Sequence, residues 1–270
     1  MNYQIGVADY GMDVWYGGNL NLEQRLELLK SCGIGGIEWL KAADMAEAVQ
    51  NAALFHRLGM DFASCNMNSP ELTMKCACAF GKEYVWITTP ARRTVPFETY
   101  CRQANAFVEA AAYYGLKAAL HNHLGTRVES PQELDDFMAA VPGAALLLDT
   151  AHLHAAGGDC VETIRKYHDR LAAVHFKDYF LKDESIGLDR WSERLRFCEL
   201  GGGNAGMDFA PIVRELRDHN YDKWILIEHD THLRPPEIDL KKSADILKDL
   251  FGIRQVKQSQ SDSCEGMHNV

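Results

Sequence analysis

The segment AALLLDTAH, residues 144–152, carries the pattern that decides the fold. Five apolar residues run without a break up to Asp149. Such a run is too short for a typical helix and favours a strand that is buried in a sheet. A lone carboxylate in that position would cost several kcal/mol to bury. We therefore expect Asp149 to lie at the end of a parallel strand, close to groups that neutralise its charge.

The same pattern recurs along the whole chain. Short apolar runs bounded by Gly, Pro, Asp or Asn predict strands over residues 3–8, 34–40, 60–66, 84–88, 116–121, 144–149, 171–176 and 224–228. Amphipathic or Ala-rich stretches predict helices that include residues 20–31, 97–114, 131–140 and 239–251. Eight strand–helix units in about 250 residues predict an α/β protein that forms a single (β/α)8 TIM barrel.

Alternatives to this organisation are less consistent with the sequence. A doubly wound sheet needs fewer strands, and the glycines of residues 33–36 precede a strand, whereas those of a dinucleotide-binding turn follow one. We expect one barrel domain over residues 1–254 and a polar tail over 255–270. The connection from Lys177 to Met207 is long for a loop of this fold, which indicates either a lid or an interface element.

Composition and charge limit the function. The 270 residues include 28 Lys and Arg against 38 Asp and Glu, and the net charge of −10 argues against binding to nucleic acid or to an anionic membrane. We see no apolar stretch near the roughly 20 residues of a membrane span. The first residues lack the basic and apolar regions of a signal peptide. We therefore expect a cytoplasmic protein whose eight cysteines are reduced.

Polar residues directly follow several of the predicted strands, and in a barrel of this kind the carboxyl ends of the strands converge on one mouth. These residues are Glu38, Asn66, His121, His123, Asp149, His152, His175, Lys177 and Glu228. Any one of them has an ordinary structural explanation, such as a helix cap for Asp149. Together they predict a site for a cation. Asp, Glu and His ligands suit Mn²⁺, Mg²⁺, Co²⁺ or Zn²⁺ better than copper or an iron–sulfur cluster.

Four ordered segments carry a resemblance to a known family. They are LHNHLGT at 120–126, LDTAHL at 148–153, VHFKD at 174–178 and WILIE at 224–228. Together they resemble the xylose isomerase-like TIM barrel superfamily, which contains sugar phosphate isomerases and epimerases and also inosose dehydratases. The resemblance is best between residues 115 and 230.

The resemblance implies a divalent metal with four protein ligands at the ends of strands five to eight. Asp149, His175 and Glu228 match three of these ligands. For the fourth we favour Glu129, with His121 as the alternative. We expect Mn²⁺ or Co²⁺, with Mg²⁺ and Zn²⁺ as further options.

The resemblance also implies roles around the metal. We assign catalytic roles to Glu228, His121 and Lys177. We assign substrate contacts to Glu38, Asn66, His123 and His152. The expected partner is a small sugar or cyclitol, and a homo-oligomer is an open possibility for such a barrel.

Several functions remain open at this point. The first is a sugar isomerase or epimerase acting on a keto sugar or its phosphate through a metal-stabilised enediolate. The alternative is a keto-cyclitol dehydratase that works by β-elimination, because His121 stands where many relatives have a glutamate. An abasic-site endonuclease is disfavoured by the negative charge, and a non-catalytic binding barrel by the retained polar residues. Arg92 and Arg93 fit either a phosphate contact or a solvated surface pair.

Overall fold

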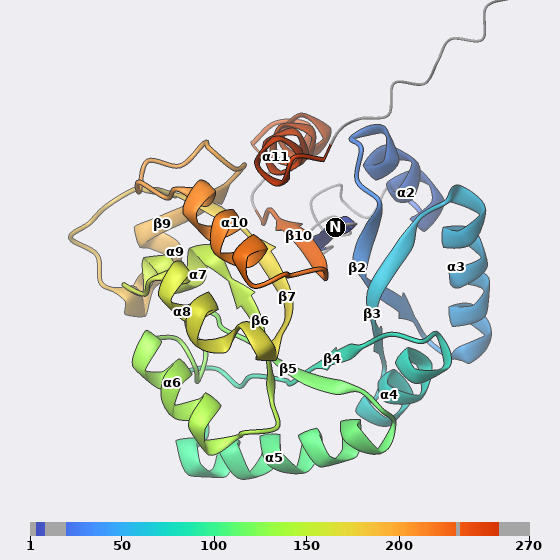
Figure 1. Cartoon of the computed structure of the whole chain (residues 1–270), viewed down its shortest axis with the longest axis horizontal. Helices are drawn as coiled ribbons and strands as arrows, with labels where there is room; N and C mark the ends of the chain where they lie inside the picture. The colour runs from blue at the N-terminus through green and yellow to red at the C-terminus, as the bar shows by residue number, and fades with distance from the viewer. Residues whose placement is uncertain (1–3, 9–19, 231–232, 254–270) are drawn as a thin grey trace, which may run out of the picture.

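An eight-stranded parallel sheet, curved into a nearly closed barrel, lies at the centre of the structure, and helices surround it (Figure 1). The structure is a computed structural model and describes residues 4–8, 20–230 and 233–253. The strands pair in the order β3-β2-β1-β10-β7-β6-β5-β4. Their bounds are Gln4–Ala8 (β1), Gly36–Ala42 (β2), Asp61–Met67 (β3), Tyr84–Trp86 (β4), Lys117–His121 (β5), Ala145–Asp149 (β6), Leu171–Phe176 (β7) and Trp224–Glu228 (β10).

The barrel is joined differently on its two sides. Strand β1 pairs with both β2 and β10, which brings the first and last strands of the barrel together. No backbone ladder links β3 to β4 within the described residues. Instead the hydroxyl of Ser64 on β3 donates a hydrogen bond of 2.6 Å to the backbone carbonyl of Tyr84 on β4. The TIM barrel predicted from the sequence is therefore confirmed.

Helices follow the strands and cover the outside of the barrel, as the outer ring of Figure 1 shows. Their bounds are Leu22–Ser31 (α2), Met45–Leu58 (α3), Pro70–Ala79 (α4), Phe97–Tyr113 (α5), Pro131–Ala140 (α6), Thr150–Ala155 (α7), Cys160–Tyr167 (α8), Phe209–Asp218 (α10) and Pro236–Phe251 (α11). Helix α6 begins where predicted, with a capping box between Ser130 and Glu133. Helix α11 begins three residues earlier than the predicted start, because Pro236 is accommodated in its first turn.

The strand interiors form the core as the apolar runs predicted. Leu146, Leu147 and Leu148 of β6 are all fully buried, because in a barrel one strand face packs against the helices and the other packs inside the sheet. None of the helices in the described part has the length and apolar character needed to cross a membrane. The seven cysteines described are free.

The long connection after β7 packs back on the end of that strand, because the ring of Phe197 lies 3.9 Å from Lys177 Nζ. It contains an antiparallel hairpin of β8 (Asp178–Leu181) and β9 (Leu195–Cys198), with a 3-10 turn and the short helix α9 (Trp191–Arg194) between them. The Asp178 carboxylate accepts hydrogen bonds from the backbone N–H groups of Tyr179, Gly201 and Gly203 and so ties down the base of the hairpin. The two roles predicted for this connection, lid or interface element, stay predictions. The predicted tail at 255–270 lies outside the described residues, and the domain limits stay a prediction.

Candidate metal centre

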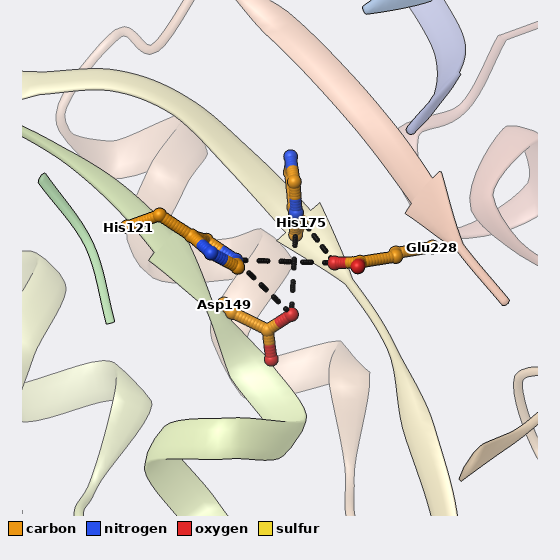
Figure 2. A group of neighbouring side chains, drawn as sticks. All are labelled: His121, Asp149, His175 and Glu228. Carbon is orange, nitrogen blue, oxygen red and sulfur yellow. Dashed lines mark hydrogen bonds and ion pairs between the residues drawn. The ribbon is translucent and has the colours of Figure 1, made fainter. Parts of the chain in front are cut away.

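Four side chains from neighbouring strands meet at the mouth of the barrel (Figure 2). His121 ends β5, Asp149 ends β6, His175 lies near the end of β7 and Glu228 ends β10. All four are buried, and each offers one ligand atom within 4.8 Å of the others. Three of the four are the ligands that the sequence predicted, and the fourth is the alternative, His121.

Most of the distances within this four-residue group fit a small divalent cation, whereas His175 Nδ1 and Glu228 Oε2, 2.6 Å apart, lie at hydrogen-bond distance and would have to separate to bind one. His121 Nε2 lies 3.6 Å from Asp149 Oδ2 and 3.9 Å from Glu228 Oε2, and His175 Nδ1 lies 4.0 Å from Asp149 Oδ2. Bond lengths near 2.1 Å in a four-coordinate site separate the ligand atoms by about 3.4 Å. Both His121 Nε2 and Asp149 Oδ2 are buried without a hydrogen-bond partner in the described structure. A buried polar atom without a partner is costly, and a metal ion would satisfy both atoms.

The local sequence around Asp149 explains how its carboxylate can cap a helix and also face the four-residue group. Asp149 is the N-cap of α7, and its Oδ1 accepts a hydrogen bond of 2.7 Å from the backbone N–H of His152. The Asn122 side chain bonds to both the N–H and the carbonyl of Asp149, which fixes the strand end. Helix capping was the structural explanation considered from the sequence. The geometry shows that capping uses one oxygen and turns the other toward His121.

His175 lies between two carboxylates. Its Nδ1 is 2.6 Å from Glu228 Oε2, and its Nε2 is 3.0 Å from Glu38 Oε2. Burial lowers the pKa of His175, but the carboxylates of Glu38 and Glu228 outweigh it and raise the pKa to about 10. For the Asp149 carboxyl, burial has the opposite effect and raises the pKa to about 7. In the absence of a metal the group therefore carries protons that a cation would replace.

Lys177 is completely buried beside the group. Its Nζ donates to Asp230 at 2.6 Å, lies 3.1 Å from Glu228 Oε1, and lies 3.2 Å from His152 Nε2. The ring of Phe197 on β9 covers it, with the centroid 3.9 Å from Nζ. Burial opposes ionisation of Glu228, yet Lys177 and His175 hold the pKa of its carboxyl well below the ordinary value. Lys177 thus keeps Glu228 ionised.

The remaining histidines of the site are neutral. Burial and the neighbouring His175 lower the pKa of His121 to about 3. Burial and His121 lower the pKa of His123 to about 4, and burial holds the pKa of His152 well below its usual range. His123 Nδ1 lies 2.5 Å from the carbonyl oxygen of Leu124, which can only accept, so the ring proton lies there. The Nε2 of His123 is therefore a hydrogen-bond acceptor.

A cavity of about 480 Å³ opens onto this group. Its lining includes six of the predicted site residues, namely Glu38, Asn66, His121, His123, His175 and Glu228. Trp39 and Trp86 form part of the wall, with ring centroids 4.5 Å apart. Asp149, His152 and Lys177 lie outside this lining, beneath the residues that face the cavity.

Glu129 does not join the four-residue group. Its Oε2 accepts a hydrogen bond of 2.9 Å from the N–H of Gly125 and forms an ion pair with Arg92. Gly125 has a φ of +78°, and the close approach of Trp191 leaves no room there for a side chain. Both Glu129 and Arg92 line a separate cavity together with Arg93. The geometry places His121, and not Glu129, in the four-residue group, whereas the sequence favoured Glu129.

A second group of three residues has atoms spaced like metal ligands, but its carboxylates are already paired with cationic side chains. Glu199, His229 and Asp239 offer atoms within 4.8 Å of one another. Arg234 pairs with both carboxylates, and Lys242 lies 3.1 Å from Glu199. Because two cations already compensate the two carboxylates, a divalent ion would have to displace them.

Sequence reasoning did not identify three residues that shape the site. Tyr84 and Trp86 both bond to Glu38, and Asp230 holds Lys177. The two aromatic residues belong to an apolar run, where residue type indicates packing and gives no sign of a polar partner. Asp230 lies two residues after the end of β10, so its position after a strand was a usable signal.

The fold and this site define a class: parallel barrels in which acidic and imidazole side chains that could hold a metal lie at the carboxyl ends of four neighbouring strands. The model of the xylose isomerase-like TIM barrel family matches residues 26–250. The chain belongs to this family, and the resemblance seen in the sequence is confirmed.

Characterised relatives and solved structures agree with this placement. An inosose dehydratase of Lactiplantibacillus plantarum is 33% identical over 138 residues, which cover 49% of this chain and 46% of the relative. The chain thus matches a little under half the length of that relative. Among solved structures, the IOLI protein with a bound zinc atom has a TM-score of 0.67 at 17% identity, covering 93% of this chain and 98% of the other. An L-ribulose 3-epimerase has a TM-score of 0.68 at 14% identity, covering 93% and 94%. These two structures show a common fold.

Proposed function

We propose that this chain is a divalent-metal-dependent hydro-lyase that removes water from a polyhydroxylated ketone of the inosose type. The observation that carries this choice is the imidazole of His121 at the end of β5. Epimerases of this family use two glutamates, one on each face of the substrate. Here Glu228 is the single glutamate of the four-residue group. The similarity to proteins named inosose dehydratase supports the same choice.

The proposed ligands are His121 Nε2, Asp149 Oδ2, His175 Nδ1 and Glu228 Oε2. A divalent ion held there would polarise the ketone and stabilise the negative charge that develops on its oxygen during enolisation. Mn²⁺ and Co²⁺ suit this mixed set of nitrogen and carboxylate ligands, and Zn²⁺ and Mg²⁺ are also candidates. The zinc atom in the IOLI structure supports a divalent ion without deciding its identity.

Glu228 is the residue that we assign to proton transfer. Two carboxylates line the cavity among the described residues, Glu38 and Glu228, and of these two Glu228 belongs to the four-residue group that would hold the metal. Glu228 takes the proton from the carbon beside the ketone. The electron pair of that C–H bond then forms a carbon–carbon double bond while the β-hydroxyl leaves. The same carboxyl returns its proton to the leaving hydroxyl, so that one water is lost.

The other site residues hold the substrate or hold Glu228. His123 lines the cavity with an acceptor nitrogen suited to a substrate hydroxyl, and Asn66 lines the opposite part of the wall. Lys177 keeps Glu228 ionised and does not line the cavity. His152 does not line the cavity and acts through its contact with Lys177.

The substrate that fits this cavity is uncharged. No Lys or Arg lines the cavity within the described ranges. Arg92 and Arg93, the phosphate-contact candidates, line a different cavity, where Arg92 pairs with Glu129. A phosphate would therefore meet no Lys or Arg on the described part of the cavity wall, whereas neutral hydroxyls find His123, Asn66 and Thr126.

A sugar isomerase or epimerase is the second candidate, because the same removal of an α-proton by Glu228 starts each reaction. To distinguish them, the metal-loaded protein is incubated in deuterated water with an inosose and, separately, with unphosphorylated ketohexoses. We expect a product lighter by one water from the inosose, detected by mass spectrometry. Deuterium exchange and an isomerised or epimerised ketohexose, without dehydration of the inosose, would support the second candidate and overturn the first.

A further inference from the structure

A buried carboxylate lies on the side of His175 that faces away from the four-residue group. Glu38, on β2, is only 1% exposed. Its Oε1 accepts hydrogen bonds from the Tyr84 hydroxyl and from Trp86 Nε1, each at 2.8 Å. Its Oε2 lies 3.0 Å from His175 Nε2. All the hydrogen bonds of this carboxylate therefore go to other side chains of the protein, although it borders the cavity.

These partners fix how the carboxylate is oriented. The indole N–H of Trp86 can only donate, so the atom that faces it must be an acceptor. With Oε1 held in this way by two donors, Oε2 is directed at His175. The indole ring of Trp86 also packs near both histidines of the group, with centroids 4.6 Å from His121 and 5.7 Å from His175. The carboxylate is thus held in one orientation next to a candidate ligand.

When His175 carries one ring proton, two carboxylates compete for it. Glu228 Oε2 lies 2.6 Å from Nδ1, and a proton there would block that atom from binding a metal. Glu38 Oε2 lies next to Nε2, and a proton there leaves the Nδ1 lone pair directed at the group. A hydrogen bond from the distal nitrogen of a histidine to a carboxylate fixes the tautomer and raises the basicity of a ligand.

We propose that Glu38 is a positioning residue that keeps the ring proton of His175 on Nε2 and so makes Nδ1 available as a metal ligand. The proposal rests on the metal-dependent function proposed above. It changes the role expected for Glu38 from the sequence, where it was assigned to substrate binding. Both oxygens of Glu38 are already engaged by Tyr84, Trp86 and His175.

The substitution Glu38→Gln tests the proposal because it reverses the direction of the hydrogen bond between residue 38 and His175 Nε2. The amide oxygen of the glutamine must face Trp86 Nε1, so its NH₂ group faces His175 Nε2 and donates to it. His175 must then accept at Nε2 and carry its proton at Nδ1. We expect the affinity for Mn²⁺, measured by calorimetry, to fall by about 10- to 100-fold.

Tyr84→Phe is the matched control. It removes one hydrogen bond from the same buried carboxylate and leaves the contact between Oε2 and His175 intact. We expect its Mn²⁺ affinity to stay within about threefold of the unmodified protein, a smaller change than the loss of an outer partner of a ligand. An equal loss in both variants would mean that Glu38 acts only through the stability of the barrel interior, and would overturn the proposal.

A measurement on the unmodified chain keeps the proposal testable even if a variant fails to fold. In protein labelled with ¹⁵N-histidine and loaded with Zn²⁺, long-range proton–nitrogen spectra report which ring nitrogen of His175 carries the proton. The signal is assigned by its loss in His175→Gln. A proton on Nε2 is expected, and a proton on Nδ1 would overturn the proposal. If the unmodified protein bound no divalent metal, the proposed function itself would fail, which is a different result from metal binding that Glu38→Gln leaves unchanged.

Discussion

Asp149 caps helix α7 with one carboxylate oxygen, which accepts the N–H of His152 at 2.7 Å, and directs the other oxygen toward His121 Nε2 at 3.6 Å. The first contact is local, between residues three apart in the chain. The second joins the ends of two strands. One side chain therefore connects the folding of this segment with the assembly of the proposed metal centre, and the two roles can be separated experimentally.

The substitution Asp149→Ser should separate capping from metal binding. A serine hydroxyl still caps the helix, whereas the ligand oxygen is lost. We expect the metal content after dialysis, measured by elemental analysis, to fall to background, while the unfolding free energy of the metal-free protein changes little. Asp149→Ala should lose the metal and, in addition, about 1 kcal/mol of stability from the missing cap. Retention of metal in Asp149→Ser would show that Asp149 is not a ligand.

The fourth ligand is tested by a pair of variants. His121→Gln should weaken Mn²⁺ binding by about 100-fold or more, because outer partners of ligands alone change affinity by 10- to 100-fold. Glu129→Gln should leave Mn²⁺ affinity close to that of the unmodified protein, since Glu129 pairs with Arg92 and Gly125. The reverse pattern in calorimetric titrations would restore Glu129 as the ligand.

Glu228→Gln should abolish proton removal. The substitution keeps the size of the side chain and one oxygen but removes the base. In deuterated water, exchange of the α-proton of an inosose should fall by about two orders of magnitude or more. The comparison is made at Mn²⁺ concentrations that saturate the variant, so that weaker metal binding does not account for the loss. If Glu228→Gln retained exchange and His121→Gln lost it under the same conditions, His121 would be the base.

Metal affinity should rise with pH. The carboxylates of Glu38 and Glu228 raise the pKa of His175 to about 10, so a metal at Nδ1 must displace a proton throughout the neutral range. Displacement of one proton increases the apparent affinity about tenfold per pH unit. Below about pH 7 the slope should steepen, because Asp149, with a pKa of about 7, is then also protonated. Calorimetry in buffers of different ionisation enthalpy measures the protons released, and a flat profile from pH 6 to 8 would contradict this prediction.

Gly203→Ala should loosen the hairpin that covers Lys177. An added Cβ would lie 2.2 Å from Asp178 Oδ1 and 2.4 Å from the backbone oxygen of Tyr179. The hydrogen bonds that hold the base of the hairpin would have to shift, and we expect the unfolding free energy in urea to fall by about 1–3 kcal/mol. Gly35→Ala is the control, because its Cβ would meet only the Ile5 carbonyl oxygen at 3.5 Å, an ordinary contact. Equal stability of the two variants would show that this close approach is unimportant.

The barrel itself was predictable because its signals are local. The run before Asp149 is apolar whatever surrounds it, and a polar residue after such a run marks the end of a strand in a barrel. The capping box of Ser130 and Glu133 is likewise a relation between residues three apart. The sequence therefore determined the order of strands and helices, and with it the presence of Asp149, His175 and Glu228 at one mouth.

Only the tertiary structure distinguishes His121 from Glu129. Both residues belong to the segment after β5, and their types suit a metal equally well. What separates them is Arg92, which follows β4, lies 37 positions before Glu129 in the chain, and pairs with it away from the group. The role proposed for Glu38 has the same origin, because its partners Tyr84, Trp86 and His175 come from two other strands. Hydrogen bonds and ion pairs between distant residues depend on how the chain closes into a barrel, and residue type and spacing along the sequence carry no record of them.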